Sequence, residues 1–250
     1  MKILAIESAS LTASAALVTD GILTAVYTVN DRKTHSQTLL PMVDEICRMV
    51  QLDKREIDAV AVSSGPGSFT GLRIGAATAK GIGLALGIPL IGVPTLGALA
   101  YNFWGSDALL CPVMDARRGQ VYNALYHCRE ELEPLTEARA IAAEDLIREL
   151  CGREERAIFL GDGVPVIREA AEKRLTVPYL FAPAHQSRQR AASVGALGER
   201  MLAAGECVKA ADFVPFYLRL SQAEREREEA VRLNQEKALA AGIAPRVKDR

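Results

Sequence analysis

The chain has 250 residues and a formal net charge of -1, from 30 lysines and arginines against 31 aspartates and glutamates. A protein that grips nucleic acid by itself usually gathers an excess of basic residues, so this balance argues against autonomous RNA or DNA binding but not against RNA held jointly with a partner. Apolar residues make up 49% and aromatic residues 5% of the chain, a composition typical of a globular protein with one large domain or two lobes.

The five cysteines are scattered and form no C-x-x-C pair, which argues against a disulfide framework and a zinc ribbon. Residues 81–106 carry no charge and are numerous enough to cross a bilayer. They include six glycines and two prolines, so a buried helix, strand and second helix fit this stretch better than one membrane span. With no export signal at the start of the chain, we expect a cytoplasmic protein without membrane association.

The first elements predict a mixed α/β sheet. Apolar runs at 3–6, 13–18 and 22–29 are separated by a polar loop and by Asp20-Gly21, and an Asp-Gly pair between apolar runs is a strong hairpin signal. A three-stranded antiparallel meander should therefore open the chain. A helix, a strand, a helix, a strand and a helix are expected next, at 36–50, 59–63, 70–86, 90–93 and from about 95.

The second half predicts another sheet with flanking helices. Strands are expected at 108–114 and 120–128, closed into a hairpin by 115–119, then a helix at 143–151, a strand at 157–160 and a helix at 191–204. We therefore expect a two-lobed α/β protein with an N-terminal lobe at 1–106, a C-terminal lobe at 107–220 and a charged tail at 221–250. A C-terminal helix is a candidate for packing back on the first lobe, and the tail is expected to be a solvated helix or a frayed end.

Two loops lie where nucleotide-binding relatives of such sheets hold phosphate. The first, Glu7-Ser-Ala-Ser-Leu-Thr, has Glu in place of Asp and Ala in place of Gly, and both changes crowd a phosphate, so a structural turn is favoured. The second, Asp115-Ala-Arg-Arg-Gly, has the Asp, but Arg117 and Arg118 occupy positions that need small residues. Two roles for Arg117 and Arg118 remain equal alternatives: they are an ordinary pair of surface arginines, or they form a docking contact with an acidic partner.

Gly65-Pro-Gly-Ser-Phe-Thr-Gly-Leu-Arg precedes the helix at 70–86 and is not a Walker A loop, because no second Gly lies five residues on and no Lys-Ser/Thr follows. Within this helix, small residues recur at every fourth position, at Gly71, Gly75, Ala79 and Gly83. Such a ridge permits the close approach of a second helix. Tight packing on the chain's own sheet is the equal alternative.

The helix at 36–50 has more apolar surface than one sheet face requires. Either the helix at 70–86 covers all of it or a second chain does. Metal and nucleophile patterns are absent from the sequence, because His35, His127 and His185 are far apart and no G-x-S-x-G is present. His35 is interpreted as a helix-entry or interface residue rather than a base.

Several segments together closely resemble the bacterial TsaB (YeaZ-like) family over about residues 1–230: Ile3-Leu-Ala-Ile-Glu-Ser, Thr34-His-Ser-Gln-Thr-Leu-Leu-Pro, Met114-Asp-Ala-Arg-Arg-Gly-Gln-Val-Tyr, Gly161-Asp-Gly, Pro215-Phe-Tyr-Leu-Arg and the highly specific Gly-Pro-Gly block. Its motif residues here are Gly65, Pro66, Gly67, Ser68, Phe69, Thr70, Arg73, Asp115, Arg117 and Arg118. The resemblance implies the two-lobed fold of actin, Hsp70 and sugar kinases. It also implies a noncatalytic role in making threonylcarbamoyladenosine at position 37 of tRNAs that read ANN codons.

The family's partners are a related TsaD-type transferase, which holds the metal and forms a heterodimer with TsaB, and a small TsaE-type ATPase that the assembly recruits. The resemblance therefore implies a cytoplasmic subunit that meets tRNA only through the complex and has no cofactor or metal of its own. The transferase's metal site needs H-x-x-x-H after the strand that ends at Val93-Pro94, where this chain has Thr95-Leu-Gly-Ala-Leu.

The expected dimer surface comprises residues of both helices: His35, Leu39, Leu40, Val43, Ile46, Cys47, Gly71, Leu72, Ile74, Gly75, Thr78, Ala79 and Ile82. Substitutions such as Gly75→Leu or Ala79→Trp are expected to abolish the heterodimer while the chain stays folded. The same surface is a candidate for a homodimer when the partner is absent. The alternative function is a small-molecule phosphotransferase of the same fold, for which ATP binding that is lost on Asp115→Ala would be diagnostic.

Overall fold

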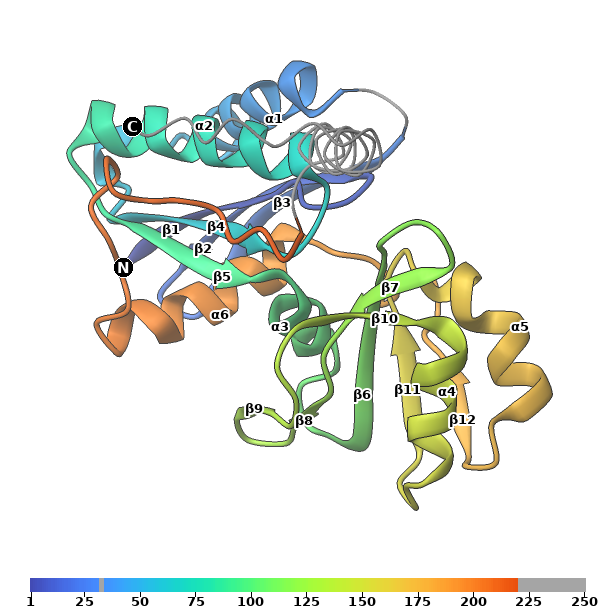
Figure 1. Cartoon of the computed structure of the whole chain (residues 1–250). Coiled ribbons are helices and arrows are strands. Elements are labelled where there is room, and N and C mark those ends of the chain that lie inside the picture. Colours follow the sequence, from blue (N-terminus) through green and yellow to red (C-terminus); the bar gives the residue numbers. More distant parts are fainter. Residues whose placement is uncertain (32–33, 220–250) are drawn as a thin grey trace, which may run out of the picture. The chain divides into compact units, whose positions relative to one another are not determined.

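A computed structural model describes residues 1–31 and 34–219 of the chain (Figure 1). Its contacts cluster Met1–Leu218 as one unit, apart from the remainder that begins at Arg219. The lobe boundaries at 106 and 220 therefore stay a prediction. The charged tail predicted at 221–250 lies outside the described residues. No helix in the described part of the chain is long and apolar enough to cross a membrane.

The first sheet has five strands in the order β3-β2-β1-β4-β5. Their bounds are β1 Lys2–Glu7, β2 Thr12–Thr19, β3 Ile22–Asn30, β4 Ala59–Gly65 and β5 Leu90–Pro94. The first three strands pair antiparallel, whereas β4 pairs parallel with β1 and β5 parallel with β4. Asp20 and Gly21 close the β2–β3 hairpin with φ angles of 50° and 77°, as the Asp-Gly pair predicts. The antiparallel meander and the mixed sheet are confirmed.

Helices cover both faces of this sheet (Figure 1). On one face, α1 (His35–Met49) and α2 (Phe69–Leu86) pack on Leu4, Ile6 and their neighbours. On the other face, α6 (Ala191–Ala203) packs on Ile3 and Ala5. The alternation of β1 side chains between the two clusters follows from the two-residue period of a strand. The short helices η1 (Lys54–Glu56), α3 (Thr95–Ala100) and η2 (Tyr101–Phe103) complete this half.

The second sheet follows the order β10-β7-β6-β11-β12, with β8 paired to β6 and to β9 off this path. Its strands are β6 Ser106–Asp115, β7 Gln120–Asn123, β8 Tyr126–Cys128, β9 Leu132–Pro134, β10 Arg139–Ala142, β11 Ala157–Leu160 and β12 Tyr179–Phe181, and its helices are α4 Ala143–Cys151 and α5 Val164–Arg174. Two mixed sheets with flanking helices confirm the expected actin/Hsp70/sugar-kinase type of fold.

One strand prediction is wrong in the second sheet. The apolar run at 120–128 forms two strands, β7 and β8, which exchange partners around Ala124 and Leu125. β7 pairs with β6 and β10, whereas β8 pairs with β6 and β9. Asn123 lies at the break, where its buried amide donates to the carbonyl of Pro112 at 3.0 Å and to that of Ala124 at 3.2 Å. A continuous apolar pattern cannot reveal a change of partner.

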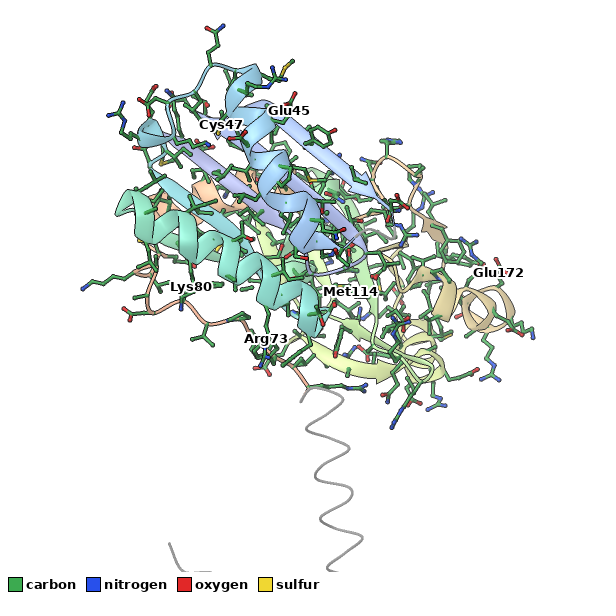
Figure 2. All side chains as sticks on the ribbon, turned by 90° about the horizontal axis from the view of Figure 1, so that it is seen from above. Glu45, Cys47, Arg73, Lys80, Met114 and Glu172 are labelled. Atoms are coloured by element: carbon green, nitrogen blue, oxygen red, sulfur yellow. The ribbon has the colours of Figure 1, made fainter. Side chains whose placement is uncertain are left out.

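The segment after α6 returns to the first sheet. Val208 and Leu90 form a β-bridge, and the amide of Phe216 donates to the carbonyl of Ser64 at 2.7 Å. The ammonium of Lys80, on α2, donates to the carbonyls of Ala211 and Phe213 (Figure 2). This segment therefore covers the β5 edge of the first sheet.

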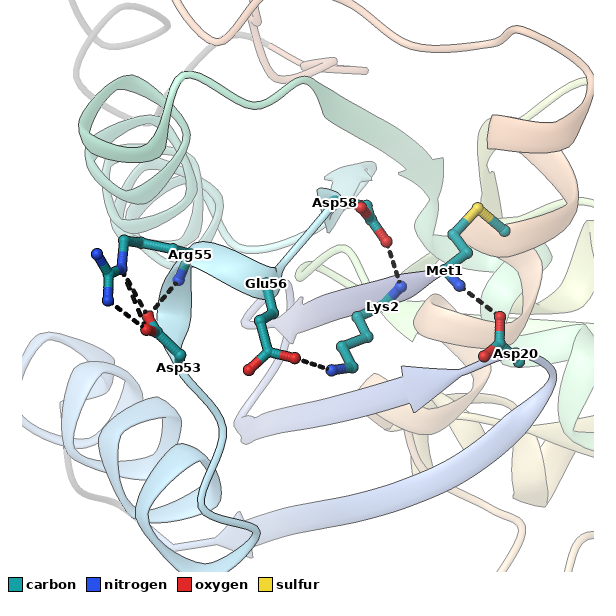
Figure 3. A network of polar contacts seen from close by, with 7 residues as sticks. All are labelled: Met1, Lys2, Asp20, Asp53, Arg55, Glu56 and Asp58. Carbon is teal, nitrogen blue, oxygen red and sulfur yellow. Dashed lines mark hydrogen bonds and ion pairs between the residues drawn. The ribbon is translucent and has the colours of Figure 1, made fainter.

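Charged groups surround the start of β1 (Figure 3). The amide of Lys2 donates to the Asp58 carboxylate at 2.6 Å, and its ammonium pairs with Glu56. The terminal ammonium of Met1 pairs with Asp20, a bond that raises the pKa of the amino group. Ion pairs as exposed as these contribute little to stability, so they orient the strand end more than they stabilise the fold.

Candidate partner-binding site

Most of the apolar surface of α1 belongs to the core of the chain. Leu39, Val43, Ile46 and Cys47 are each less than 5% exposed and pack with β1, β2 and β4 in one cluster. Figure 2 shows Cys47 on α1. The expectation that Leu39, Ile46 and Cys47 line a partner surface is therefore corrected, because their side chains already have neighbours within the chain. Leu40, which is 58% exposed, remains accessible.

The small residues of α2 also face inward. A Cβ on Gly71 would lie 2.1 Å from the carbonyl oxygen of Ser8, and one on Gly75 would lie 2.2 Å from the Ser8 hydroxyl. The Ser8 hydroxyl in turn donates to the carbonyl of Gly71 at 2.9 Å. Ala79 is fully buried in the same core as α1, and Leu72 is 1% exposed. Of the two alternatives for this ridge, tight packing within the chain is the correct one.

This placement corrects a further expectation. Leucine at position 75 would meet the β1–β2 loop, and tryptophan at position 79 would enter the core. Neither substitution would leave the fold intact while removing a partner, since overpacking a core is itself destabilising.

A groove remains between the two helices. It has a volume of about 440 Å³ and is lined by Leu4, Leu40, Pro41, Val43, Asp44, Lys54, Ile57, Ile82, Ala85 and Leu86. The ammonium of Lys54 pairs with the Asp44 carboxylate at 2.6 Å and lowers the pKa of that carboxyl. The groove is thus apolar inside and carries one ion pair. Of the surface expected from sequence, only Leu40, Val43 and Ile82 line it.

Three other expected residues lie outside the groove. Ile74 and Thr78 are half-buried on α2, where the Thr78 hydroxyl donates to the carbonyl of Ile74 at 2.9 Å. The ring of His35 donates from Nε2 to the carbonyl of Ser10 at 2.7 Å, which ties the start of α1 to the β1–β2 loop. Sequence reasoning missed Ile57, Ala85 and Leu86 as groove residues. Ala85 and Leu86 could have been found from their position on α2, one turn after Ile82.

The β1–β2 loop uses its polar groups on its own chain. The amide of Ala9 donates to the buried Glu7 carboxylate at 2.6 Å, and the amide of Thr12 donates to the Ser10 hydroxyl at 3.2 Å. The carbonyl of Ala9 accepts from the amide of Ser68 at 2.7 Å. The Gly-Pro-Gly segment therefore lies on this loop. A phosphate cradle needs free amides at such a turn, and those of Ala9 and Thr12 are engaged.

Glu7 itself is fully buried. Burial raises its pKa to about 7, against the opposing effect of hydrogen bonds from the Ser63 hydroxyl and the Ala9 amide. Asp162, half-buried after β11, adds a like charge and also has a raised pKa because of burial.

The remaining motif residues form surface structure. Arg117 and Arg118 are exposed and adopt φ angles of 66° and 56° in the β6–β7 turn, where Arg117 donates from its amide and its guanidinium to Asp115 at 2.7 and 3.0 Å. Ser68 caps the start of α2. There the Arg73 guanidinium lies 4.0 Å from the centroid of the Phe69 ring, and the centroids of the Phe69 and Tyr217 rings are 4.9 Å apart. The sequence left open whether the arginine pair is a docking contact, and that alternative stays open.

No group of three or more histidines, cysteines, aspartates or glutamates within residues 1–31 and 34–219 is placed to hold a metal ion. Where the transferase pattern requires histidine, the hydroxyl of Thr95 accepts a hydrogen bond from the amide of Gly65 at 3.1 Å. A threonine hydroxyl bonded in this way is no substitute for an imidazole ligand.

Known proteins match the chain over most of its length. A family model described as TsaD: tRNA N6-adenosine threonylcarbamoyltransferase matches residues 29–227. The tRNA threonylcarbamoyladenosine biosynthesis protein TsaB of Bacillus subtilis is 32% identical over 225 residues, which is 90% of this chain and 96% of that protein. The Escherichia coli protein of the same name is 42% identical over 129 residues, which is 50% of this chain and 55% of that protein.

Solved structures agree with these relatives. A Pseudomonas aeruginosa structure, described as an uncharacterized protein with similarity to peptidase YEAZ, superposes with a TM-score of 0.76 at 25% identity and covers 87% of this chain and 99% of that chain. The length of the Bacillus match, the family model and this shared fold identify the group. The chain belongs to the family whose model matches residues 29–227. Within that family it belongs to the TsaB (YeaZ-like) proteins.

Proposed function

We propose that this chain is a noncatalytic scaffold in the biosynthesis of tRNA threonylcarbamoyladenosine. In this role it forms a heterodimer with a TsaD-type transferase, activates it for modification of position 37 in ANN-decoding tRNAs, and supports recruitment of a TsaE-type ATPase. The observation that carries the proposal is the open apolar groove between α1 and α2 in a member of the TsaB family.

The groove suits a helix of another protein. Two neighbouring helices that leave an apolar furrow form half of a helix bundle, and a partner side chain inserted there completes the packing. Leu40 and Ile82 lie on opposite walls, on α1 and α2. Covering the exposed part of a leucine side chain contributes on the order of 1 kcal/mol. The Asp44–Lys54 pair adds polar contacts that select among partners more than they add affinity.

The noncatalytic part of the proposal rests on what the loops are used for. The amides of Ala9 and Thr12 that would meet a phosphate are bonded within the chain, and Thr95 stands in place of a metal-binding histidine. Metal, nucleotide and threonylcarbamoyl chemistry would then belong to the partner subunits, and tRNA would be met through the complex.

Complementation in cells that depend on this chain for the modification tests the proposal. Leu40→Glu, which places a charge in the groove, is expected to abolish co-purification of the transferase and to lower the modified fraction of ANN-decoding tRNAs at least tenfold. The matched control is Met49→Glu, on the same helix, 67% exposed and outside the groove. Normal modification by a stably folded Leu40→Glu variant would contradict the groove assignment.

A further inference from the structure

Glu7 is a buried carboxyl that the proposed scaffold role does not use. It ends β1 and accepts hydrogen bonds from the Ala9 amide and the Ser63 hydroxyl. Opposite it in the sheet lies Ser14 of β2, which is buried as well. These neighbours are all uncharged, so none of them neutralises an ionised carboxylate. Burying a carboxylate whose charge is not neutralised is costly.

A second carboxyl from the other sheet lies near Glu7. Asp162 follows β11 and acts on Glu7 as a like charge. Asp162 is acted on in turn by the opposite charge of Arg188 and by the like charge of Asp115, on β6. Two carboxyls in such a place tend to hold a proton between them, because burial and mutual repulsion both disfavour a double negative charge.

One short segment bridges the surroundings of the two carboxyls. Residues 187–191, which we call the crossing segment, lead from β12 of the second sheet into α6 on the first. At its start, the carbonyl of Ser187 accepts from the amide of Gly161 at 2.7 Å, next to Asp162. At its end, the amide of Ala191 donates to the hydroxyl of Ser14 at 3.0 Å, opposite Glu7. The crossing segment therefore joins the two sheets at the carboxyl pair.

The middle of the crossing segment lacks a hydrogen-bond donor. Gln189 is 2% exposed, and its amide nitrogen donates to the Asp162 carboxylate at 3.4 Å. Its Oε1 is buried and has no hydrogen-bond partner in the part of the chain that the structure describes. Leaving a buried acceptor unsatisfied is costly, and the hydroxyl of a protonated carboxyl is a donor of the kind it lacks. The unpaired oxygen therefore points, independently of the like charges, to a proton in this cluster.

We propose that Glu7 and Asp162 form a proton-dependent latch between the two sheets. While the pair holds a proton, the crossing segment stays closed, and when the proton is lost, the segment is released and water reaches both carboxyls. The pKa of each group is raised mainly by burial, and the Glu7 value of about 7 places the change near neutral pH. The latch therefore opens as the pH rises through about 7. Its residues lie outside the groove between α1 and α2, so the latch and the partner site can be tested separately.

Hydrogen exchange of the full chain at pH 5 and pH 8, expressed as protection factors, tests the latch. Protection of the Gly161 and Ala191 amides is expected to fall at least twentyfold between these values. At pH 8 it should be lower than that of the slowest amides of β1, because the latch opens without unfolding the sheet. Glu7→Gln has no charge to lose and should change by less than about threefold. The matched control Glu172→Gln, at an exposed position of α5 (Figure 2), should behave like the wild type.

Two results overturn the proposal. One is protection of the two amides that does not change with pH in the wild type. The other is protection equal to that of the slowest β1 amides at pH 8, which would mean that only global unfolding reaches the pair. If Glu7→Gln does not fold, the carbon-13 NMR shift of the Glu7 carboxyl in the wild type decides: a midpoint near pH 7 supports the latch, and one below pH 5 overturns it. Asp162→Asn removes the like charge and should lower that midpoint, whereas an unchanged midpoint would contradict the pairing.

Discussion

Replacing Gly71 by alanine is expected to lower the free energy of unfolding by about 3 kcal/mol or more, although alanine is the better helix former. The added methyl group would lie 2.1 Å from the carbonyl oxygen of Ser8, a backbone atom of the loop that follows β1. Because that loop also bonds to Ser68 and Glu7, it cannot retreat without breaking other contacts. Chemical denaturation of the purified variant measures the loss.

Gly81→Ala is the matched control. Gly81 lies in the same helix, but no atom is within 4 Å of its added methyl group, so this variant should gain roughly 0.5–1 kcal/mol from helix propensity alone. Gly75→Ala should resemble Gly71→Ala in sign but lose less, because the atom it meets is the rotatable Ser8 hydroxyl. If Gly71→Ala were as stable as Gly81→Ala, the inward orientation of the ridge would be wrong.

Glu7→Gln is expected to change how stability depends on pH. The folded pKa of Glu7 is raised to about 7 from an ordinary value of 4.5 because the carboxyl is buried. The folded state therefore binds the proton more tightly than the unfolded state does. The stabilisation from this group is complete below pH 4.5 and is lost as the pH rises through about 7, a change of about 3 kcal/mol.

Glutamine is nearly isosteric and neutral at every pH. Its carbonyl can accept from the Ala9 amide, and its amide can donate to the Ser63 hydroxyl. Denaturant unfolding of both proteins at pH 5 and pH 8 gives the comparison: relative to the wild type, Glu7→Gln should become more stable by about 2.5 kcal/mol between these values. A constant difference between the two proteins would show that ionised Glu7 is well accommodated in the fold.

Local signals in the sequence predicted much of the fold, such as the Asp20-Gly21 pair that marked the first hairpin. The structure adds Ser68 as the N-cap of α2 and the left-handed Gly87 at its end, two local signals that our sequence predictions did not use. α5 was missed although Pro165 lies in its first turn, because its apolar pattern is weak. The β7–β8 exchange of partners depends on contacts that are distant in sequence, which no local pattern records.

The candidate site shows the same limit. A four-residue spacing correctly placed Gly71, Gly75 and Ala79 on one face of α2, but spacing does not say what that face meets. The answer depends on Ser8, a residue more than sixty positions away. Leu40 and Ile82 were found because they are apolar residues beyond what the core needs. The Lys54–Asp44 pair at the groove required the position of η1, which sequence pattern alone does not give.

The central claim is that the groove between α1 and α2 binds the transferase subunit, and calorimetric titration of the full chain with that subunit tests it most directly. Ile82→Glu alters the groove, whereas Leu84→Glu alters an exposed leucine of α2 outside it. Ile82→Glu should weaken binding at least a hundredfold, with Leu84→Glu within about threefold of the wild type, since an unpaired buried charge costs several kcal/mol. Equal affinities for the two folded variants would contradict the claim.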